Sequence, residues 1–151
     1  MDSEDFSTGR LVSYGRQLVD IHLALREQLA SLRQGGAARD LRMHCLAFCA
    51  ALTRHHLGED GGAFVVLAER YPALRPVIEE LVRDHAAVSD ILRRLADLVR
   101  SPDAADVHME LDGLAAVLES HFAYEERKLT AALNTLDPAS DGDLLGTPRS
   151  P

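Results

Sequence analysis

The sequence predicts an all-α protein that folds as an antiparallel four-helix bundle with up-down-up-down order. Leu and Ala supply most of the apolar residues, and aromatic residues make up only 5% of the 151-residue chain, a composition that favours helices over strands. Apolar residues recur every three to four positions in four long segments, which is the period of an amphipathic helix. Short connections between such segments make consecutive helices antiparallel.

Gly35-Gly36 separates the first two expected helices. The apolar stripe of the first helix comprises Leu11, Gly15, Leu18, His22, Leu25, Leu29 and Leu32. The stripe of the second helix comprises Leu41, Cys45, Phe48, Leu52, His55, Glu59, Gly62 and Val66. A glycine inside a helix costs about 1 kcal/mol relative to alanine. We therefore expect Gly58, Gly61 and Gly62 to mark a bend or the close approach of a neighbouring helix.

Prolines mark the next two junctions, at Tyr71-Pro72 to Pro76 and at Ser101-Pro102-Asp103. The third stripe comprises Ile78, Leu81, His85, Val88, Leu92, Leu95 and Val99. The fourth stripe comprises Leu111, Leu114, Leu118, His121, Glu125, Leu129 and Leu133. The chain is rich in Gly, Ser, Asp and Pro from Asp137 onward. We expect the bundle to span residues 10–136, with a frayed N-terminus at residues 1–9 and a disordered tail at residues 137–151.

Composition limits the partners of this chain. It has 16 basic and 24 acidic residues and a formal net charge of −8, which makes it a poor match for nucleic acid or anionic lipid. No apolar run approaches the roughly 18 residues of a membrane span, and residues 1–9 lack the basic and apolar regions of a signal peptide. We expect a cytoplasmic protein without nucleic-acid or membrane partners. Cys45 and Cys49 are expected to be reduced thiols, because a bridge within one helix is geometrically awkward.

Each of the four stripes contains a histidine where an aliphatic residue is expected. These residues are His22, His55, His85 and His121. A single histidine on an apolar face is usually a core residue, but four of them, one per helix near one level, indicate a shared site. Glu59 and Glu125 follow two of the histidines by four positions, and therefore lie on the same helix faces. Buried carboxylates cost several kcal/mol each unless they are paired or bind a metal, so the pattern predicts a metal site.

The donor set narrows the choice of metal. Imidazole and carboxylate ligands without a thiolate suit iron, manganese or zinc. Six protein ligands exceed what one tetrahedral zinc ion needs. The set divides naturally over two ions, with the carboxylates as bridges, as in the carboxylate-bridged centres of other helix bundles.

The ordered pattern resembles the hemerythrin-like, or HHE cation-binding, family. The segments RHHLGEDGGAF and ESHFAYEERKL resemble the two His/Glu blocks of that family, and the resemblance covers about residues 10–136. It implies a four-helix bundle with a non-haem di-iron centre, two iron ions, that handles O2, peroxide or NO. The residues that match the motif are His22, His55, Glu59, His85, His121 and Glu125.

The chain departs from the oxygen-carrying members of the family in its third helix. Those proteins have a second histidine one turn after the histidine of the third helix, and this chain has Ser89 there. A neutral hydroxyl is a weak iron ligand. We expect the missing ligand to leave an open coordination position, or another side chain to fill it. The candidates are Tyr124, Tyr14 and His56.

The fourth helix also departs from that pattern, because the carriers have an aspartate five residues after the histidine. Here Glu125 stands at spacing four and Glu126 at spacing five. We expect Glu126 and Asp60 to be either solvated or partners that orient an imidazole. His56 is rotated about 100° from His55 around the helix, so we expect it at the rim. His44 and His108 lie too far along their helices to share the site, and Arg26 is expected on a solvated face.

These observations support three classes of function. The first is a di-iron protein that acts on small oxidants, with catalase-like or peroxidase-like reactivity favoured because a ligand is missing. The second is an O2-activating oxidase or oxygenase that acts on an organic substrate, for which Gly58, Gly61, Gly62 and Ala63 would open a cavity. The third is a module that binds or stores iron, or senses O2, without turnover. The sequence identifies no catalytic residue beyond the metal ligands.

Overall fold

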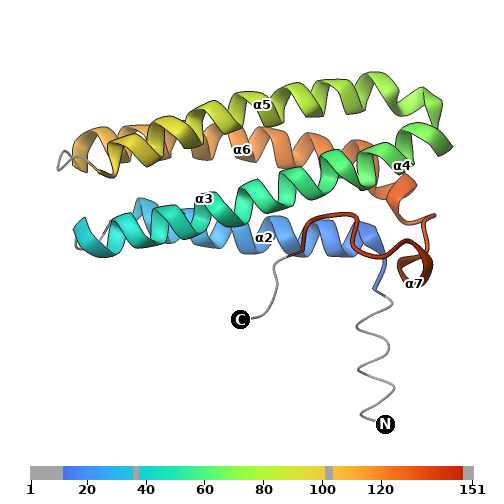
Figure 1. Ribbon diagram of the computed structural model, residues 1–151, viewed down its shortest axis with the longest axis horizontal. Helices are drawn as coiled ribbons and strands as arrows, with labels where there is room; N and C mark the ends of the chain where they lie inside the picture. Colours follow the sequence, from blue (N-terminus) through green and yellow to red (C-terminus); the bar gives the residue numbers. More distant parts are fainter. Residues whose placement is uncertain (1–11, 36–37, 101–103, 148–151) are drawn as a thin grey trace, which may run out of the picture.

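A computed structural model describes residues 12–35, 38–100 and 104–147, and all of the regular structure in these ranges is helical (Figure 1). The helices are α2 (Tyr14–Arg33), α3 (Ala38–Gly61), α4 (Ala63–Arg70), the 3-10 turn η1 (Pro72–Leu74), α5 (Arg75–Leu98), α6 (Ala104–Leu133) and α7 (Pro138–Asp141). The N-terminus that was expected to be frayed lies outside the described ranges. In the described part of the chain, no helix has the length and apolar character needed to cross a membrane.

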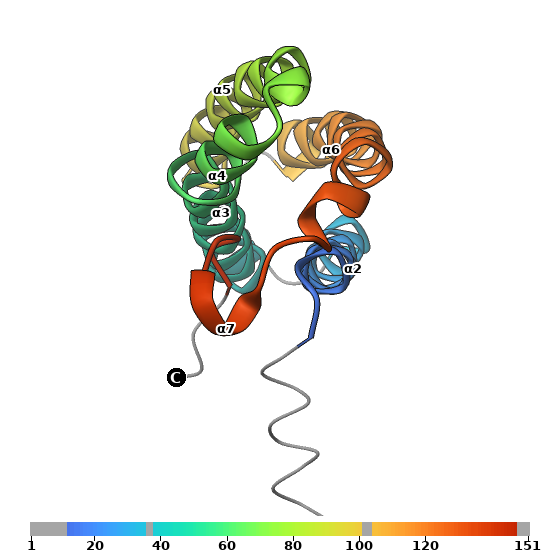
Figure 2. The same ribbon diagram turned by 90° about the vertical axis from the view of Figure 1, so that its right-hand side faces the viewer.

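The four long helices lie side by side around one interior. Helix α2 packs against α3 and α6, and α5 packs against the same two helices from the other side. The view along the bundle shows α3 with α4, α5, α6 and α2 as four columns (Figure 2). The resulting cyclic order, α2, α3, α5, α6, determines which helices exchange contacts in the site.

The stripes identified in the sequence form the core. The apolar residues of all four stripes are buried, except that Val66 is half-buried and Leu11 lies outside the described residues. Local signals set the ends of the helices. Ser13 caps α2 by accepting a hydrogen bond from the Arg16 amide at 3.3 Å, and Gly35 follows α2 with a φ of 88°. Pro76 lies in the first turn of α5.

The second predicted helix is two helices. Helix α3 ends at Gly61 and α4 begins at Ala63, with Gly62 between them at φ −122° and ψ −92°. The Ala63 amide donates a hydrogen bond to the Leu144 carbonyl at 3.0 Å. The glycines therefore mark a break, and the segment that approaches them is the C-terminal part of the chain rather than a helix of the bundle.

The chain after Asp137 differs from the prediction of a disordered tail as far as residue 147. Residues 138–141 form α7, and Leu144 and Leu145 are 7% and 1% exposed. Gly142 and Gly146 turn the chain with φ values of 73° and 60°. Composition did not predict this order, because only two leucines attach the segment to the bundle and its other contacts are made by the backbone. Residues 148–151 lie outside the described part.

The cysteines provide no thiolate to the interior. Both thiols are free, with Cys45 buried and Cys49 half-buried on α3. Burial raises the pKa of the Cys49 thiol to about 11 and also raises the pKa of Cys45. Both side chains are therefore neutral thiols at physiological pH, which agrees with the expected donor set of imidazoles and carboxylates.

Candidate metal centre

The six residues predicted as metal ligands meet in the middle of the bundle. Every one of them is at most 4% exposed. They come from all four long helices: His22 from α2, His55 and Glu59 from α3, His85 from α5, and His121 and Glu125 from α6. The helical spacing of four residues brings each glutamate under its histidine, as the sequence predicted.

Glu59 lies between two imidazoles from different helices. Its Oε1 atom is 3.4 Å from Nε2 of His55 and 3.4 Å from Nε2 of His85. Burial and the charge of Glu125 raise the pKa of Glu59 well above its usual value. Without a cation, the bundle therefore favours a protonated Glu59.

Glu125 occupies the equivalent position on the other pair of helices. Its Oε1 atom is 3.1 Å from Nε2 of His22 and 4.0 Å from Nε2 of His121. Burial acts to raise the pKa of Glu125, but its contacts with Glu59 and His22 outweigh burial, and the pKa is lowered. The two glutamates thus behave as a pair in which one carboxylate keeps a proton and the other stays ionised.

The outer nitrogens of three imidazoles contact carboxylates of neighbouring helices. The Nδ1 contacts are His22 with Glu126 at 2.7 Å, His85 with Asp60 at 2.8 Å, and His121 with Asp84 at 3.1 Å. An ionised carboxylate accepts but does not donate, so Nδ1 of each ring carries the proton. The Nε2 atom of each ring then faces into the bundle, which is the orientation of a metal-binding histidine.

The fourth imidazole has a backbone partner. Nδ1 of His55 donates to the carbonyl oxygen of Leu145 at 2.6 Å. Its Nε2 atom lies 3.2 Å from Nε2 of His22, so the inward nitrogens of two rings face each other. A cation between them would bind both nitrogens. Burial lowers the pKa of His55 to about 4 and also lowers that of His85, which keeps the rings neutral and able to bind a metal.

His56 is part of the interior, whereas the sequence placed it at the rim. It is 6% exposed, and its ring stacks on that of His85 with the centroids 3.7 Å apart. One nitrogen from each of His56, His85 and His121 lies within 4.8 Å of the others. Because α3 contacts both α2 and α5, its inward face is wide enough for adjacent histidines: His55 faces α2 and His56 faces α5. Helix α3 therefore places a third imidazole nitrogen beside those of α5 and α6.

Three other candidates for that position lie elsewhere. The Tyr14 hydroxyl donates to the Gly142 carbonyl at 2.5 Å, and the Tyr124 hydroxyl donates to Glu80 at 3.0 Å near the surface. Ser89 is exposed.

The adjacent acids Asp60 and Glu126 orient imidazoles, which was one of the two roles expected of them. Arg26, expected on a solvated face, lies 3.3 Å from Glu126 through Nη1 and so holds that carboxylate in place. The sequence pattern did not predict the contacts of Asp84 and of the Leu145 carbonyl. Asp84 carried a usable signal: like Asp60 and Glu126, it is an acid next to an inward residue, on the flank that faces the neighbouring helix. A backbone carbonyl leaves no such signal.

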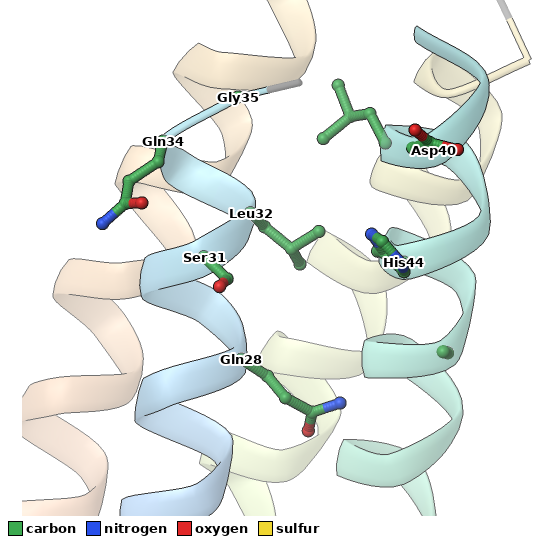
Figure 3. Close-up of a pocket in the computed structure, with 9 residues that line it drawn as sticks. Gln28, Ser31, Leu32, Gln34, Gly35, Asp40 and His44 are labelled. Carbon is green, nitrogen blue, oxygen red and sulfur yellow. The ribbon is translucent and has the colours of Figure 1, made fainter. Parts of the chain in front are cut away.

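The remaining histidines are remote from this cluster, as predicted. His44 lines a groove of about 500 Å³ between the C-terminal end of α2 and the N-terminal part of α3. Figure 3 shows His44 and Gln28 pointing into that groove from opposite helices. His108 lies near Gly35 at the same end of the bundle. Neither belongs to the groups of potential ligands.

The cluster has the features of a cation site. Among the described residues, six buried side-chain atoms have no hydrogen-bond partner: Nε2 of His56, His85 and His121, Oε1 of Glu59, and both carboxylate oxygens of Glu125. Buried polar atoms without partners are rare in folded proteins, and a bound ion is one of the explanations for them. Nitrogen and carboxylate donors of this kind fit iron, manganese or zinc.

A comparison with family models agrees with this geometry. The model described as hemerythrin HHE cation-binding domain matches residues 15–133. The chain belongs to the hemerythrin HHE family. The matched region contains every inward histidine and glutamate, but it ends before α7 and the segment that carries Leu145. Neither a curated protein nor a solved structure matches the chain. The hemerythrin HHE domain accounts for cation binding, and the contacts after residue 133 are features of this chain beyond the family match.

Proposed function

We propose that this protein holds two iron ions in a non-haem centre and binds small oxidants there: O2, peroxide or NO. The observation that supports this most directly is the set of partnerless buried nitrogens and oxygens between the four helices. We infer that α2, α3 with α4, α5 and α6 form an up-down-up-down bundle around that centre. The cyclic contacts of these helices support this order.

The ligands would divide unequally between the two ions. One ion would be held by His56, His85 and His121, and the other by His22 and His55. Glu59 and Glu125 would bridge them, since each contacts imidazoles from both sets. We expected the open position on the α5 side, but His56 supplies a nitrogen there. We therefore place the exchangeable position at the end with two histidines.

The protein's own residues prepare this end for a small ligand. Phe122 stacks on the His22 ring with the centroids 3.9 Å apart, and Leu145 is buried next to His55. Both side chains are buried and apolar and would limit the access of water to that end. When bound, ferrous ions would supply the electrons that O2 or peroxide accepts. Glu126 and the Leu145 carbonyl keep the protons on Nδ1 of His22 and His55.

The presence of His56 changes the expected reactivity. The preference for catalase-like or peroxidase-like chemistry rested on a missing nitrogen ligand, and His56 removes that reason. The proposal is therefore binding of a small oxidant, with electron transfer to it, and the choice between reversible binding and turnover is left to experiment.

A second candidate, oxidation of an organic substrate, is favoured by one observation. A groove of about 270 Å³ between α3 and α5 is lined by His56, Asp60, His85 and Ser89, among others. A small organic molecule in that groove would lie next to the end with three histidines.

The experiment exposes the ferrous protein to O2 and then removes the gas under vacuum while the optical spectrum is followed. Binding predicts a new visible band on addition of O2, and azide or NO should also change the spectrum. Full and repeated recovery of the reduced spectrum would indicate reversible carriage. Irreversible oxidation would indicate electron transfer to O2, and continued consumption of O2 or peroxide with an added reductant would indicate turnover. A protein loaded with iron that responds to none of O2, peroxide and NO would refute the proposal.

A further inference from the structure

Carboxylates of neighbouring helices contact the outer nitrogen, Nδ1, of three of the four histidines that come one from each long helix. Asp60 of α3 holds His85 of α5, and Asp84 of α5 holds His121 of α6. Glu126 of α6 then holds His22 of α2. Each acid thus reaches the next helix in the cyclic order. The remaining link, from α2 to His55 of α3, has no acid.

The sequence of α2 explains why this link is missing. The acids of the other three helices are direct neighbours of inward residues in the sequence, whereas the neighbours of His22 are Ile21 and Leu23. The partner of His55 comes instead from residues 143–147, which we call the strap. Figure 2 shows the C-terminal segment lying across the gap between α2 and α3. The Leu145 carbonyl of the strap accepts the Nδ1 proton of His55 at 2.6 Å.

The strap is held in place by backbone contacts and by a seat of glycines. The Leu144 carbonyl accepts a hydrogen bond from the Ala63 amide at 3.0 Å. A Cβ atom on Gly58 would collide with the backbone nitrogen of Gly146, and a Cβ atom on Gly62 would lie 2.9 Å from the Leu144 oxygen. Only glycine at these two positions lets the strap lie directly on α3.

Gly146 completes this seat from the side of the strap. It is buried with a φ of 60°, and a Cβ atom there would collide with the Arg54 carbonyl oxygen. Two glycines that face each other across two segments indicate that close approach is a built feature. By contrast, a Cβ atom on the neighbouring Gly61 would meet nothing within 4 Å.

We propose that the strap is the positioning element for His55: its Leu145 carbonyl replaces the missing fourth carboxylate and holds the ring with Nε2 toward the end with two histidines. The inference rests on the proposed metal centre. His22, His85 and His121 contact carboxylates that do not belong to the strap. Displacement of the strap should therefore weaken one of the two ion sites and leave the end with His56, His85 and His121 unchanged.

The experiment compares Gly58→Ala with Gly61→Ala in the full chain. Both changes replace a glycine of α3 by alanine, which has the higher helix propensity; Gly58 lies inside the helix and Gly61 is its last residue. Only the change at Gly58 clashes with the strap. Each protein is loaded anaerobically with ferrous iron, and release of the iron to a chromogenic chelator is followed with time. For Gly58→Ala we expect two phases, in which one ion leaves at least tenfold faster than in the native protein. Gly61→Ala should release both ions at native rates.

A second pair of variants leaves the long helices unchanged. Gly146→Ala clashes with α3, whereas Gly142→Ala introduces a similar backbone strain at φ 73° with open space around it. The first should show the faster phase and the second should not. Equal acceleration of both ions in Gly58→Ala and Gly146→Ala would indicate general destabilisation and overturn the inference, as would native release rates in both.

A measurement on the metal-free protein separates this inference from the proposed function. The hydrogen-bonded Nδ1 proton of His55 should exchange slowly and give a downfield NMR signal in the native protein and in Gly61→Ala. That signal should be lost in Gly58→Ala. If the native protein binds fewer than two ions, the proposed function fails, but the NMR comparison still tests the strap. Retention of the signal in Gly58→Ala would overturn the positioning role.

Discussion

Two kinds of carboxylate lie next to each other in the sequence of this protein and have different surroundings. Glu59 and Glu125 are buried and contact inward nitrogens, whereas Asp60 and Glu126 contact the outer nitrogens and are partly exposed. The first pair would bridge the ions, and the second pair would only orient their ligands. A shift of one residue on a helix therefore separates two chemical roles.

This difference predicts the effect of four substitutions. Glu59→Ala and Glu125→Ala should each remove at least one iron per chain, because each deletes an oxygen shared by both ion sites. Asp60→Ala and Glu126→Ala should retain both ions with affinity reduced by about 10- to 100-fold, the usual effect of losing an orienting contact. Metal analysis and chelator competition measure both effects. Loss of iron from Glu126→Ala together with its retention by Glu125→Ala would show that the assigned roles are reversed.

His56 predicts a second comparison. His56→Ala should lower the iron content after gel filtration, because the end with His56, His85 and His121 would lose one of its three imidazoles and bind its ion more weakly. His44→Ala is the matched control, because His44 lies in the groove at the other end of the bundle. The measurement is iron per chain after gel filtration. If both variants retain two ions, His56 is a core residue without a role in binding.

The helical period predicted the six inward histidines and glutamates, but it did not predict three other groups of the site: His56, Asp84 and the Leu145 carbonyl. Each regular apolar stripe contains a histidine in place of an aliphatic residue. This break in the pattern identified His22, His55, His85 and His121. His56 lies outside the stripe because the interior face of α3 covers two neighbouring helices. Asp84 was not predicted because a contact between helices has no periodic pattern in the sequence. The Leu145 carbonyl was not predicted because every residue has a backbone carbonyl, so the residue type does not identify it.

Among the elements, the C-terminal segment contributes most beyond the bundle. Tyr14 of α2 is fully buried, and its hydroxyl donates to the Gly142 carbonyl. This contact joins the start of the first bundle helix to the residue that precedes the strap. The four long helices followed from stripes of apolar residues, but this segment has only two anchoring leucines and no repeating period. Its order therefore depends on tertiary contacts that the sequence pattern does not contain.

Removing the Tyr14 hydroxyl should have a measurable cost. Tyr14→Phe should lower the free energy of unfolding by about 1 kcal/mol, the net value of a typical hydrogen bond, and leave the iron content unchanged. Tyr124→Phe makes the same chemical change at a surface contact with Glu80, and should cost less than about 0.5 kcal/mol. Urea unfolding of both variants tests this. A Tyr14→Phe variant with the free energy of unfolding of the native protein would mean that the link between Tyr14 and Gly142 contributes nothing to stability.

For the molecule as a whole, the buried histidines make the metal-free bundle sensitive to acid. The pKa of His55 is lowered by burial from 6.5 to about 4, so between these values the unfolded chain binds more protons than the folded one. Stability is present above about pH 6.5 and is lost as the pH falls toward 4. The burial of His56 and His85 acts in the same direction. The raised pKa of Glu59 acts in the opposite direction, but it is one group against three histidines.

The urea midpoint of the metal-free protein should therefore be lower at pH 5 than at pH 7. Iron bound to the neutral imidazoles should raise the midpoint at pH 7, because it binds only the folded state. Chelation that leaves the melting temperature unchanged would contradict a structural role for the metal. A midpoint at pH 5 that equals or exceeds the value at pH 7 would contradict the burial argument.

We propose that five histidines and two glutamates from four helices hold two iron ions. Metal analysis of the protein after anaerobic loading with ferrous iron and gel filtration, followed by an optical spectrum in air, tests this directly. Such a centre should give two irons per chain and the charge-transfer absorption of ferric iron. A single zinc ion per chain in the purified protein, with no charge-transfer absorption after iron loading, would contradict it.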